Sequence, residues 1–209
     1  MPTTATLREQ IGETLSTCLH KQGFTGEYQP TFYRYRSNVV HVVHIAFLSR
    51  RHAAYFNSNT ASFSLCVGVS FNIDQLKHPA PREYECQIRG TLLRNFSQPG
   101  PIQHVSWWHP DKRRRDIWWV DRDGGNLERI LRHAVEVLAT SAGSWHETYS
   151  DIALLLRFLR KAHEKDARKG GPFGFGPKNS PARQSIIQQL EVMLQQQRPS
   201  QQRKETDKK

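Results

Sequence analysis

The ten residues Val39–Leu48, VVHVVHIAFL, decide the fold class of this chain. They are mostly β-branched and apolar on both faces, which predicts a strand in the middle of a sheet. Residues 61–71, ASFSLCVGVSF, alternate strictly and predict a second strand with one packed face. The other face of that strand carries small side chains that a partner could approach: Ser62, Ser64, Cys66, Gly68 and Ser70.

Three further strands are expected around this pair. Thr31–Arg36 is rich in aromatic residues, and Ser37 and Asn38 after it predict a tight hairpin to the central strand. Glu83–Arg89 and Asp116–Val120 are the remaining strand candidates.

A helix is expected before the strands. Thr6 and Glu9 predict a capping box at its start, and Gly23 supplies the left-handed residue that ends it. Its apolar stripe consists of Leu7, Ile11, Leu15, Cys18 and Leu19.

Helices are also expected after the strands. Asn126 predicts the cap of a second helix that Gly143 stops, and Ser144 with Glu147 predicts the capping box of a third. Residues 182–196 carry apolar side chains at helical spacing and predict a last helix.

This order of elements predicts an α+β fold, in which an antiparallel sheet of four to five strands packs against N-terminal and C-terminal helices. Residues 1–163 would form the α+β domain. Residues 164–179 are rich in Gly and Pro and predict a linker, followed by a C-terminal helix over 180–197. Residues 198–209 are expected to be a disordered basic tail.

Composition narrows the class of protein. The chain has 209 residues, 37% of them hydrophobic, and its 10 Phe, 6 Tyr and 5 Trp indicate a folded core. No apolar run approaches the roughly 18 residues of a membrane span, so no membrane contact is expected. Three cysteines without CxxC spacing favour a reducing cytoplasm over a disulfide framework.

The net charge of +11 is unevenly distributed. Residues 160–209, the basic C-terminal arm, hold 12 basic and 5 acidic side chains, a balance of +7. The first 159 residues hold 18 basic and 14 acidic side chains, a balance of only +4. An arm of this kind would attract any polyanion, with an attraction that salt screens. The simpler explanation of its positive charge is that it keeps the protein soluble.

No catalytic or metal-binding motif stands out. His41 and His44 are three residues apart on one strand, which places them on opposite faces. HExxH, paired CxxC and GxSxG motifs are absent, so neither a metal nor a cofactor is expected. Cys66 and Cys86 lie in strand candidates, where free cysteines usually act as small apolar residues.

Residues 92–114 predict a long excursion that joins tryptophans to a basic run. Trp107 and Trp108 precede the run 112–115, and Trp118 follows it. Aromatic faces beside cations suit single-stranded nucleic acid, and the same residue types form hot spots in protein interfaces. Strand alternation would bury one tryptophan of each pair and leave the other as a candidate contact.

Three segments resemble one known family. They are Phe32-Tyr33-Arg34, Glu85-Cys86-Gln87-Ile88-Arg89 and Asp116-Ile117-Trp118-Trp119, in this order after the first helix. Over about residues 7–140 the chain resembles the bacterial domain of unknown function 4304 family. The resemblance implies an α+β domain and brings no activity or catalytic residue with it.

The leading hypothesis is a non-catalytic domain that binds a protein, as an accessory or immunity/defence-type subunit, through the polar sheet face and the excursion. The alternative is a DNA- or RNA-binding protein that uses the excursion and the basic arm. A third hypothesis, an enzyme, would need a pocket around Arg34, His44 and Arg89. The candidate binding residues are Arg34, Arg36, His44, Arg89, Trp107, Trp108, Lys112, Arg113, Arg114, Arg115 and Trp118.

Overall fold

The computed structural model describes residues 2–28, 30–36, 39–71, 81–86, 88–92, 116–165 and 184–195. Within these residues it shows one antiparallel sheet of five strands in sequence order, flanked by helices from both ends of the chain. The predicted α+β class is therefore confirmed. The strands are β1 (Thr25–Tyr28), β2 (Thr31–Arg36), β3 (Val39–Phe47), β4 (Phe63–Phe71) and β5 (Ile88–Thr91).

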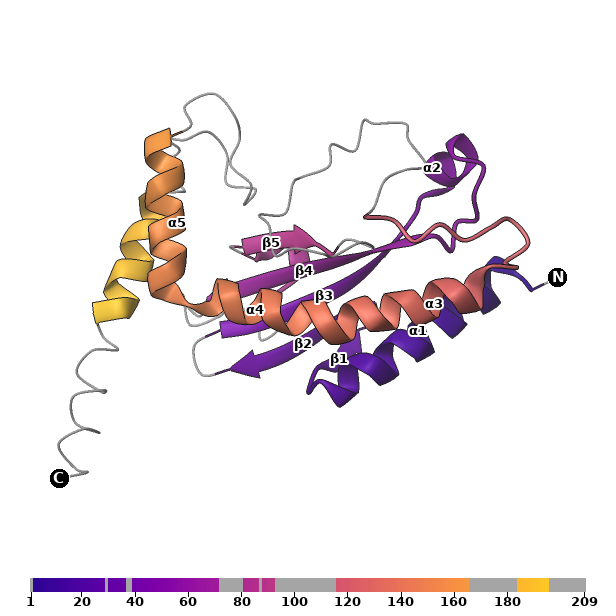
Figure 1. Ribbon diagram of the computed structural model, residues 1–209, viewed down its shortest axis with the longest axis horizontal. Coiled ribbons are helices and arrows are strands. Elements are labelled where there is room, and N and C mark those ends of the chain that lie inside the picture. Colours follow the sequence, from indigo (N-terminus) through magenta and orange to yellow (C-terminus); the bar gives the residue numbers. More distant parts are fainter. Residues whose placement is uncertain are drawn as a thin grey trace.

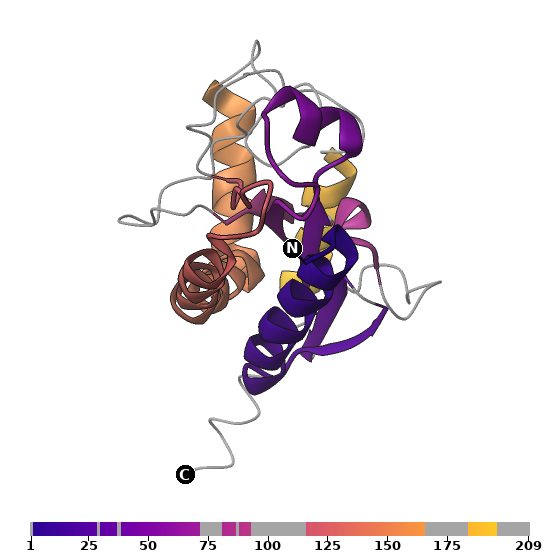
Figure 2. The same ribbon diagram turned by 90° about the vertical axis from the view of Figure 1, so that its right-hand side faces the viewer.

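The helices before and after the strands form a layer against one face of this sheet, and the short helix between β3 and β4 lies outside that layer. Helix α1 (Thr4–Lys21) and helix α3 (Leu127–Val137) lie side by side on one face (Figures 1 and 2). A π-helical turn, η2 (Leu138–Ala142), joins α3 to α4 (Gly143–Ser150), and α5 (Ile152–Lys165) follows at an angle. The helix over residues 184–195 runs beside α5 (Figure 1).

The core lies between the sheet and this helical layer. Leu7, Ile11, Leu15 and Leu19 of α1 are at most 1% exposed, as the predicted stripe requires. They pack in one cluster with the β4 side chains of odd number, from Phe63 to Phe71. Leu190 of the helix over 184–195 belongs to the same cluster, so this last helix contributes to the core.

The end of α1 agrees with the prediction and its start does not. Gly23 has φ +79°, and the amide of Phe24 donates to the Leu19 carbonyl at 3.0 Å, which closes the helix as expected. The predicted capping box at Thr6 and Glu9 is wrong. Thr3 is the N-cap, and its hydroxyl accepts from the Thr6 amide at 3.2 Å.

Gly143 does not stop the second helix. Its φ of −61° is helical, and the chain continues from α3 through η2 into α4, so Ser144 and Glu147 cap nothing. The break comes at Asp151, whose carboxylate accepts from the Leu154 amide at 3.0 Å and opens α5. The local capping pattern was outweighed by burial of this continuous helical face against the sheet.

Two strand predictions also need correction. Glu83–Arg89 divides into a 3-10 turn, η1 (Glu83–Glu85), and β5, because the Glu85 carboxylate accepts from the Arg82 amide at 2.7 Å. Residues 116–120 make only one bridge, between Trp118 and Phe63. Beyond that bridge the Val120 amide donates to the Ser62 hydroxyl at 2.9 Å, so a side chain replaces the strand ladder.

Two elements carried too weak a pattern for the sequence to predict. Strand β1 is four residues long at the sheet edge, and helix α2 (Arg50–Tyr55) is six residues long. The only local signal for α2 is Ser49, whose hydroxyl accepts from the His52 amide at 3.3 Å.

The sheet face opposite the helices is closed along β4. Ser64 and Ser70 are 5% and 2% exposed, so the predicted open face of small residues is wrong there. The surroundings of Gly68 explain why this face of β4 carries small residues, because a Cβ built on Gly68 would lie 2.6 Å from the Cys86 sulfur. The turn containing η1 therefore packs directly on this face, and Cys86 clusters with Tyr33, Val40 and Val42.

This close approach predicts the effect of adding one methyl group. Gly68→Ala should lower the free energy of unfolding by about 1–3 kcal/mol, because the new Cβ overlaps the Cys86 side chain. Cys86→Ala in the same chain should recover part of that loss by removing the sulfur. Urea denaturation of the two single variants and the double variant measures the coupling. Strictly additive losses would show that the η1 turn does not cover Gly68.

Candidate functional site

The sequence-predicted contact residues divide between the two faces of the sheet. Arg34 pairs with His41 in the β2–β3 register, and both lie on the helical face with Arg36. His44 and Arg89 lie on the opposite face, where the Thr31 hydroxyl hydrogen-bonds Nδ1 of His44 at 2.8 Å. The sheet separates the two groups, so the structure does not bring Arg34, His44 and Arg89 together around one pocket, as the enzyme hypothesis would require.

The predicted tryptophan–arginine contacts are only partly described. Trp107, Trp108, Lys112, Arg113, Arg114 and Arg115 lie outside the described residues. Trp118 is 1% exposed and stacks on Phe63 with ring centroids 5.6 Å apart. A ring buried in this way cannot stack on an external partner, so Trp118 is not the exposed member of its pair. Trp119 is half-buried.

A chain of hydrogen bonds crosses from the sheet to α4. The Arg34 guanidinium donates to Nδ1 of His41 from Nε at 3.2 Å, with Nη2 at 3.0 Å, and to the Gln22 carbonyl at 3.2 Å. Nε2 of His41 lies 2.7 Å from the Ser150 hydroxyl, which donates to the His146 carbonyl at 2.6 Å. Sequence reasoning missed this chain because the residues that join the sheet to α4, His41 and Ser150, are 109 residues apart.

The direction of these bonds decides what the serine–histidine pair can do. Arginine only donates, so Nδ1 of His41 is the acceptor and Nε2 carries the proton of the neutral ring. Nε2 therefore donates to Ser150 and cannot remove its proton. A nucleophilic serine needs the reverse arrangement, with the imidazole nitrogen as acceptor. The pair connects β3 to α4, and it is not arranged as a catalytic dyad.

Burial lowers the pKa of both histidines of this region, and for His146 it outweighs the carbonyls of Ala142 and Val42, which face its two ring nitrogens and raise its pKa. His41 is 3% exposed, and desolvation, together with His146 and Arg34, lowers its pKa to about 3. His146 is fully buried and stacks on His41 at 4.6 Å, and desolvation lowers its pKa to about 4. Nδ1 of His146 lies 2.7 Å from the Ala142 carbonyl of η2.

The thiols on the other face are poor nucleophiles. Burial raises the pKa of the Cys66 thiol to about 12, and burial also raises the pKa of Cys86. Because the thiolate is the reactive form, neither side chain is activated at neutral pH. Both cysteines act as small apolar side chains that pack on this face of the sheet.

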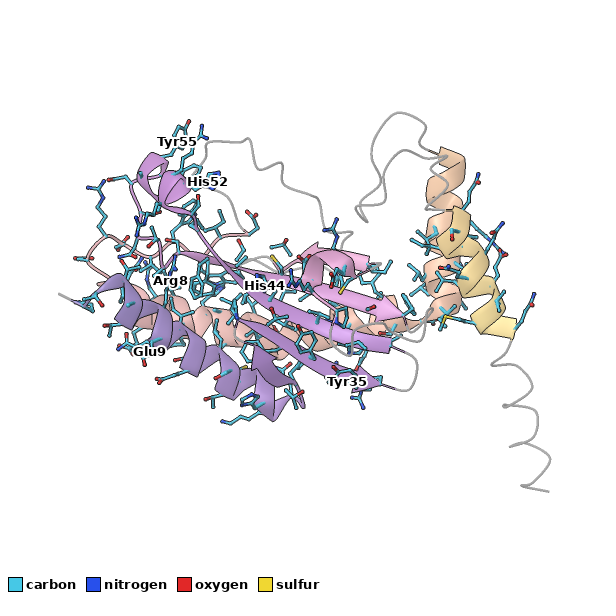
Figure 3. All side chains as sticks on the ribbon, turned by 180° about the vertical axis from the view of Figure 1, so that it is seen from behind. Arg8, Glu9, Tyr35, His44, His52 and Tyr55 are labelled. Atoms are coloured by element: carbon cyan, nitrogen blue, oxygen red, sulfur yellow. The ribbon has the colours of Figure 1, made fainter. Side chains whose placement is uncertain are left out.

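The most prominent described surface feature is on α2. Tyr55 is 68% exposed, and Arg50, Arg51 and His52 are exposed around it. We call these four side chains the α2 surface. Figure 3 shows Tyr55 and His52 at the tip of α2, projecting away from the sheet. Sequence reasoning missed this surface because it did not predict the helix.

The α2 surface rests on a fixed base. Arg8 of α1 donates to the Thr60 carbonyl at 2.8 Å and lies 4.8 Å from the centre of the Phe47 ring, which ties α1 to the segments flanking α2. Ring contacts continue inward from Tyr55 to Phe56 at 5.0 Å and from Phe56 to Trp119 at 5.0 Å. The exposed tyrosine is thus the outer end of a packed aromatic row.

Two kinds of feature are absent from the described part of the chain. It contains no group of three or more His, Cys, Asp or Glu side chains placed to hold a metal ion. No helix in it has the length and apolar character needed to cross a membrane.

The fold and these sites define a small α+β domain with a locked polar interior and an aromatic–basic surface. The comparisons with known proteins give its family. The model of the domain of unknown function DUF4304 matches residues 15–148, so the chain belongs to that family. No curated protein and no solved structure matches the chain.

The neutral histidines predict how stability depends on pH. Their folded pKa values lie below the ordinary 6.5, so the unfolded chain binds more protons as the pH falls from about 6.5 towards 4. Stability should be fully present above pH 6.5 and lower at pH 5 by about 2 kcal/mol, after allowance for solvent screening. Urea denaturation at several pH values measures this slope.

Two variants test whether His41 causes part of the slope. His41→Gln keeps a donor and an acceptor but does not titrate, so it should make the pH dependence shallower. Leu15→Ala, a buried position without a titratable group, should lower stability equally at all pH values. A slope in His41→Gln as steep as in the unmodified protein would contradict the assignment.

Proposed function

We propose that this protein is a non-catalytic binding subunit, of accessory or inhibitor type, whose partner is another protein. The observation that carries the proposal is the α2 surface: a tyrosine 68% exposed among exposed arginines. Tyrosine, tryptophan and arginine are the residue types most enriched among hot spots of protein interfaces.

The construction of the α2 surface supports this function. Tyr55 stands on a short helix whose flanks are tied by Arg8 and whose underside packs on Phe56 and Trp119. A contact residue held in place before binding loses less conformational entropy when the complex forms. The polar interior supports it as well, because the His41–Ser150 pair and the buried thiols are not arranged for nucleophilic chemistry.

The charge of the surface indicates the kind of partner. No described residue forms an ion pair with Arg50 or Arg51, so two cations accompany Tyr55 without local neutralisation. We therefore infer a partner that presents carboxylates opposite these arginines and an apolar rim opposite Tyr55. Complementary charges of this kind chiefly raise the rate of association, whereas the aromatic contact slows dissociation.

A matched pair of tyrosine variants tests the proposal. Once a partner has been isolated with the full chain and purified, its binding kinetics are measured against Tyr55→Ala and Tyr35→Ala. Tyr35 is 53% exposed on β2, away from α2 (Figure 3). Tyr55→Ala should weaken binding at least about tenfold, mainly by faster dissociation, as loss of a hot spot does. Tyr35→Ala should bind like the unmodified protein, and equal effects of the two variants would contradict the proposal.

The second candidate function is nucleic-acid binding, since stacking faces beside arginines also suit single strands. The same variants decide between the two candidates when titrated with a single-stranded oligonucleotide at several salt concentrations. If nucleic acid binds at the α2 surface, its affinity should fall steeply as the salt concentration rises, and Tyr55→Ala should weaken the binding. The slope of log affinity against log salt concentration should decrease by about 0.7 for each phosphate contact removed. A chain ending at residue 197 keeps the packed last helix and removes the distal tail as a source of unspecific attraction.

A further inference from the structure

A second site lies between the segment 118–126 and α3, and its lining includes none of the four residues of the α2 surface. It is a pocket of about 540 Å³, within the range of small-molecule sites. Its lining combines aromatic, apolar and charged side chains: Trp118, Trp119, Asp121, Asn126, Arg129, Ile130 and His133. We propose that this pocket binds a free α-amino acid with an aromatic or large apolar side chain.

The half-buried Trp119 supplies the accessible apolar wall of the pocket, whereas Trp118 and Ile130 are only 1% and 9% exposed. Trp118 is fixed by its stack on Phe63, and Trp119 by its contact with Phe56. The amide of Asn126 is already engaged: its oxygen accepts from the Asp121 amide at 3.0 Å, and its nitrogen donates to the Trp119 carbonyl at 2.9 Å. Asn126 therefore shapes the wall and leaves ligand recognition to the other polar groups.

One side of the pocket offers hydrogen-bond donors. Nε1 of Trp118 donates to Nδ1 of His133 at 3.2 Å. An indole nitrogen only donates, so Nδ1 of His133 is the acceptor in this bond and Nε2 is left as the donor nitrogen of the ring. The Arg129 guanidinium lines the same pocket and adds a positive charge with several N–H groups. Together these groups suit a carboxylate.

The pocket also contains a negative charge, the carboxylate of Asp121. Neither Asp121 nor Arg129 forms an ion pair within the described residues, although both line this one pocket. Opposite charges that remain unpaired beside an apolar wall match a zwitterion. The ligand carboxylate would lie at Arg129 and His133, its ammonium group at Asp121 or an indole face, and its side chain against the apolar wall.

This chemistry separates the proposed ligand from related molecules. A simple carboxylic acid would satisfy Arg129 and leave Asp121 unpaired, and a simple amine would do the reverse. A pocket with polar groups of both kinds discriminates against molecules that lack either one. The proposal can be tested separately from the proposed protein partner, because none of the pocket-lining side chains belongs to the α2 surface. Trp119, which also packs on Phe56, lies between the two sites.

Calorimetric titration of the full chain with L-phenylalanine tests the proposal. L-Phenylalanine should bind, and both N-acetyl-L-phenylalanine and L-phenylalaninamide should bind at least about tenfold more weakly, since each lacks one charge. Arg129→Gln and Asp121→Asn should each weaken the binding of L-phenylalanine by a similar factor. The melting temperature of each variant is measured alongside, so that loss of folding is distinguished from loss of the site.

Arg132→Gln is the matched control on the same helix. The Arg132 side chain is 76% exposed and pairs with Glu128 rather than lining the pocket, so its loss should leave the affinity unchanged. Absence of binding up to about 5 mM L-phenylalanine would overturn the proposal. So would equal affinity for the N-acetyl derivative, or equal losses in folded Arg129→Gln and Arg132→Gln.

Discussion

The guanidinium of Arg34 fixes the arrangement of the polar interior. It donates to the Gln22 carbonyl after α1 and to Nδ1 of His41 in β3, and its central carbon lies 4.7 Å from the centre of the Phe24 ring. His41 then donates through Ser150 to α4. One cation thus connects α1, two strands and α4. Because Arg34 is half-buried, desolvation lowers its pKa, and these hydrogen bonds offset part of the cost of holding its charge there.

Because of this constraint, the polar side chains of the interior and those of the candidate binding sites are different residues. The side chains that would suggest catalysis, a serine beside a histidine and two cysteines, are used in packing and hydrogen bonding. The groups left available for partners lie at the periphery, on the α2 surface and in the pocket beside α3. Trp119 lies at the border of the two, because its ring packs on Phe56 beneath the α2 surface and also lines the pocket.

The sequence predicted the elements whose pattern repeats over several turns or pairs. The stripe of α1 and the strands β2, β3 and β4 followed from periodicity, because one buried face requires regular spacing. Gly143 misled because a stop signal acts only where tertiary packing lets a helix end. Asn126 is the N-cap of α3 as predicted, although its side chain bonds Asp121 and Trp119 and does not cap the helix. The candidate sites were beyond sequence reasoning: α2 is short, and the pocket joins residues that only the fold of segment 118–126 onto α3 brings together.

The central claim is that His41 is a fixed structural donor rather than a base for Ser150. Nitrogen-15 chemical shifts of the imidazole ring, measured by NMR at pH 7 and assigned with His41→Gln, test it directly. The structure predicts a neutral His41 ring with its proton on Nε2, because Nδ1 accepts from Arg34. A proton on Nδ1 of the neutral ring, which would leave Nε2 free to accept from the Ser150 hydroxyl, would contradict the account.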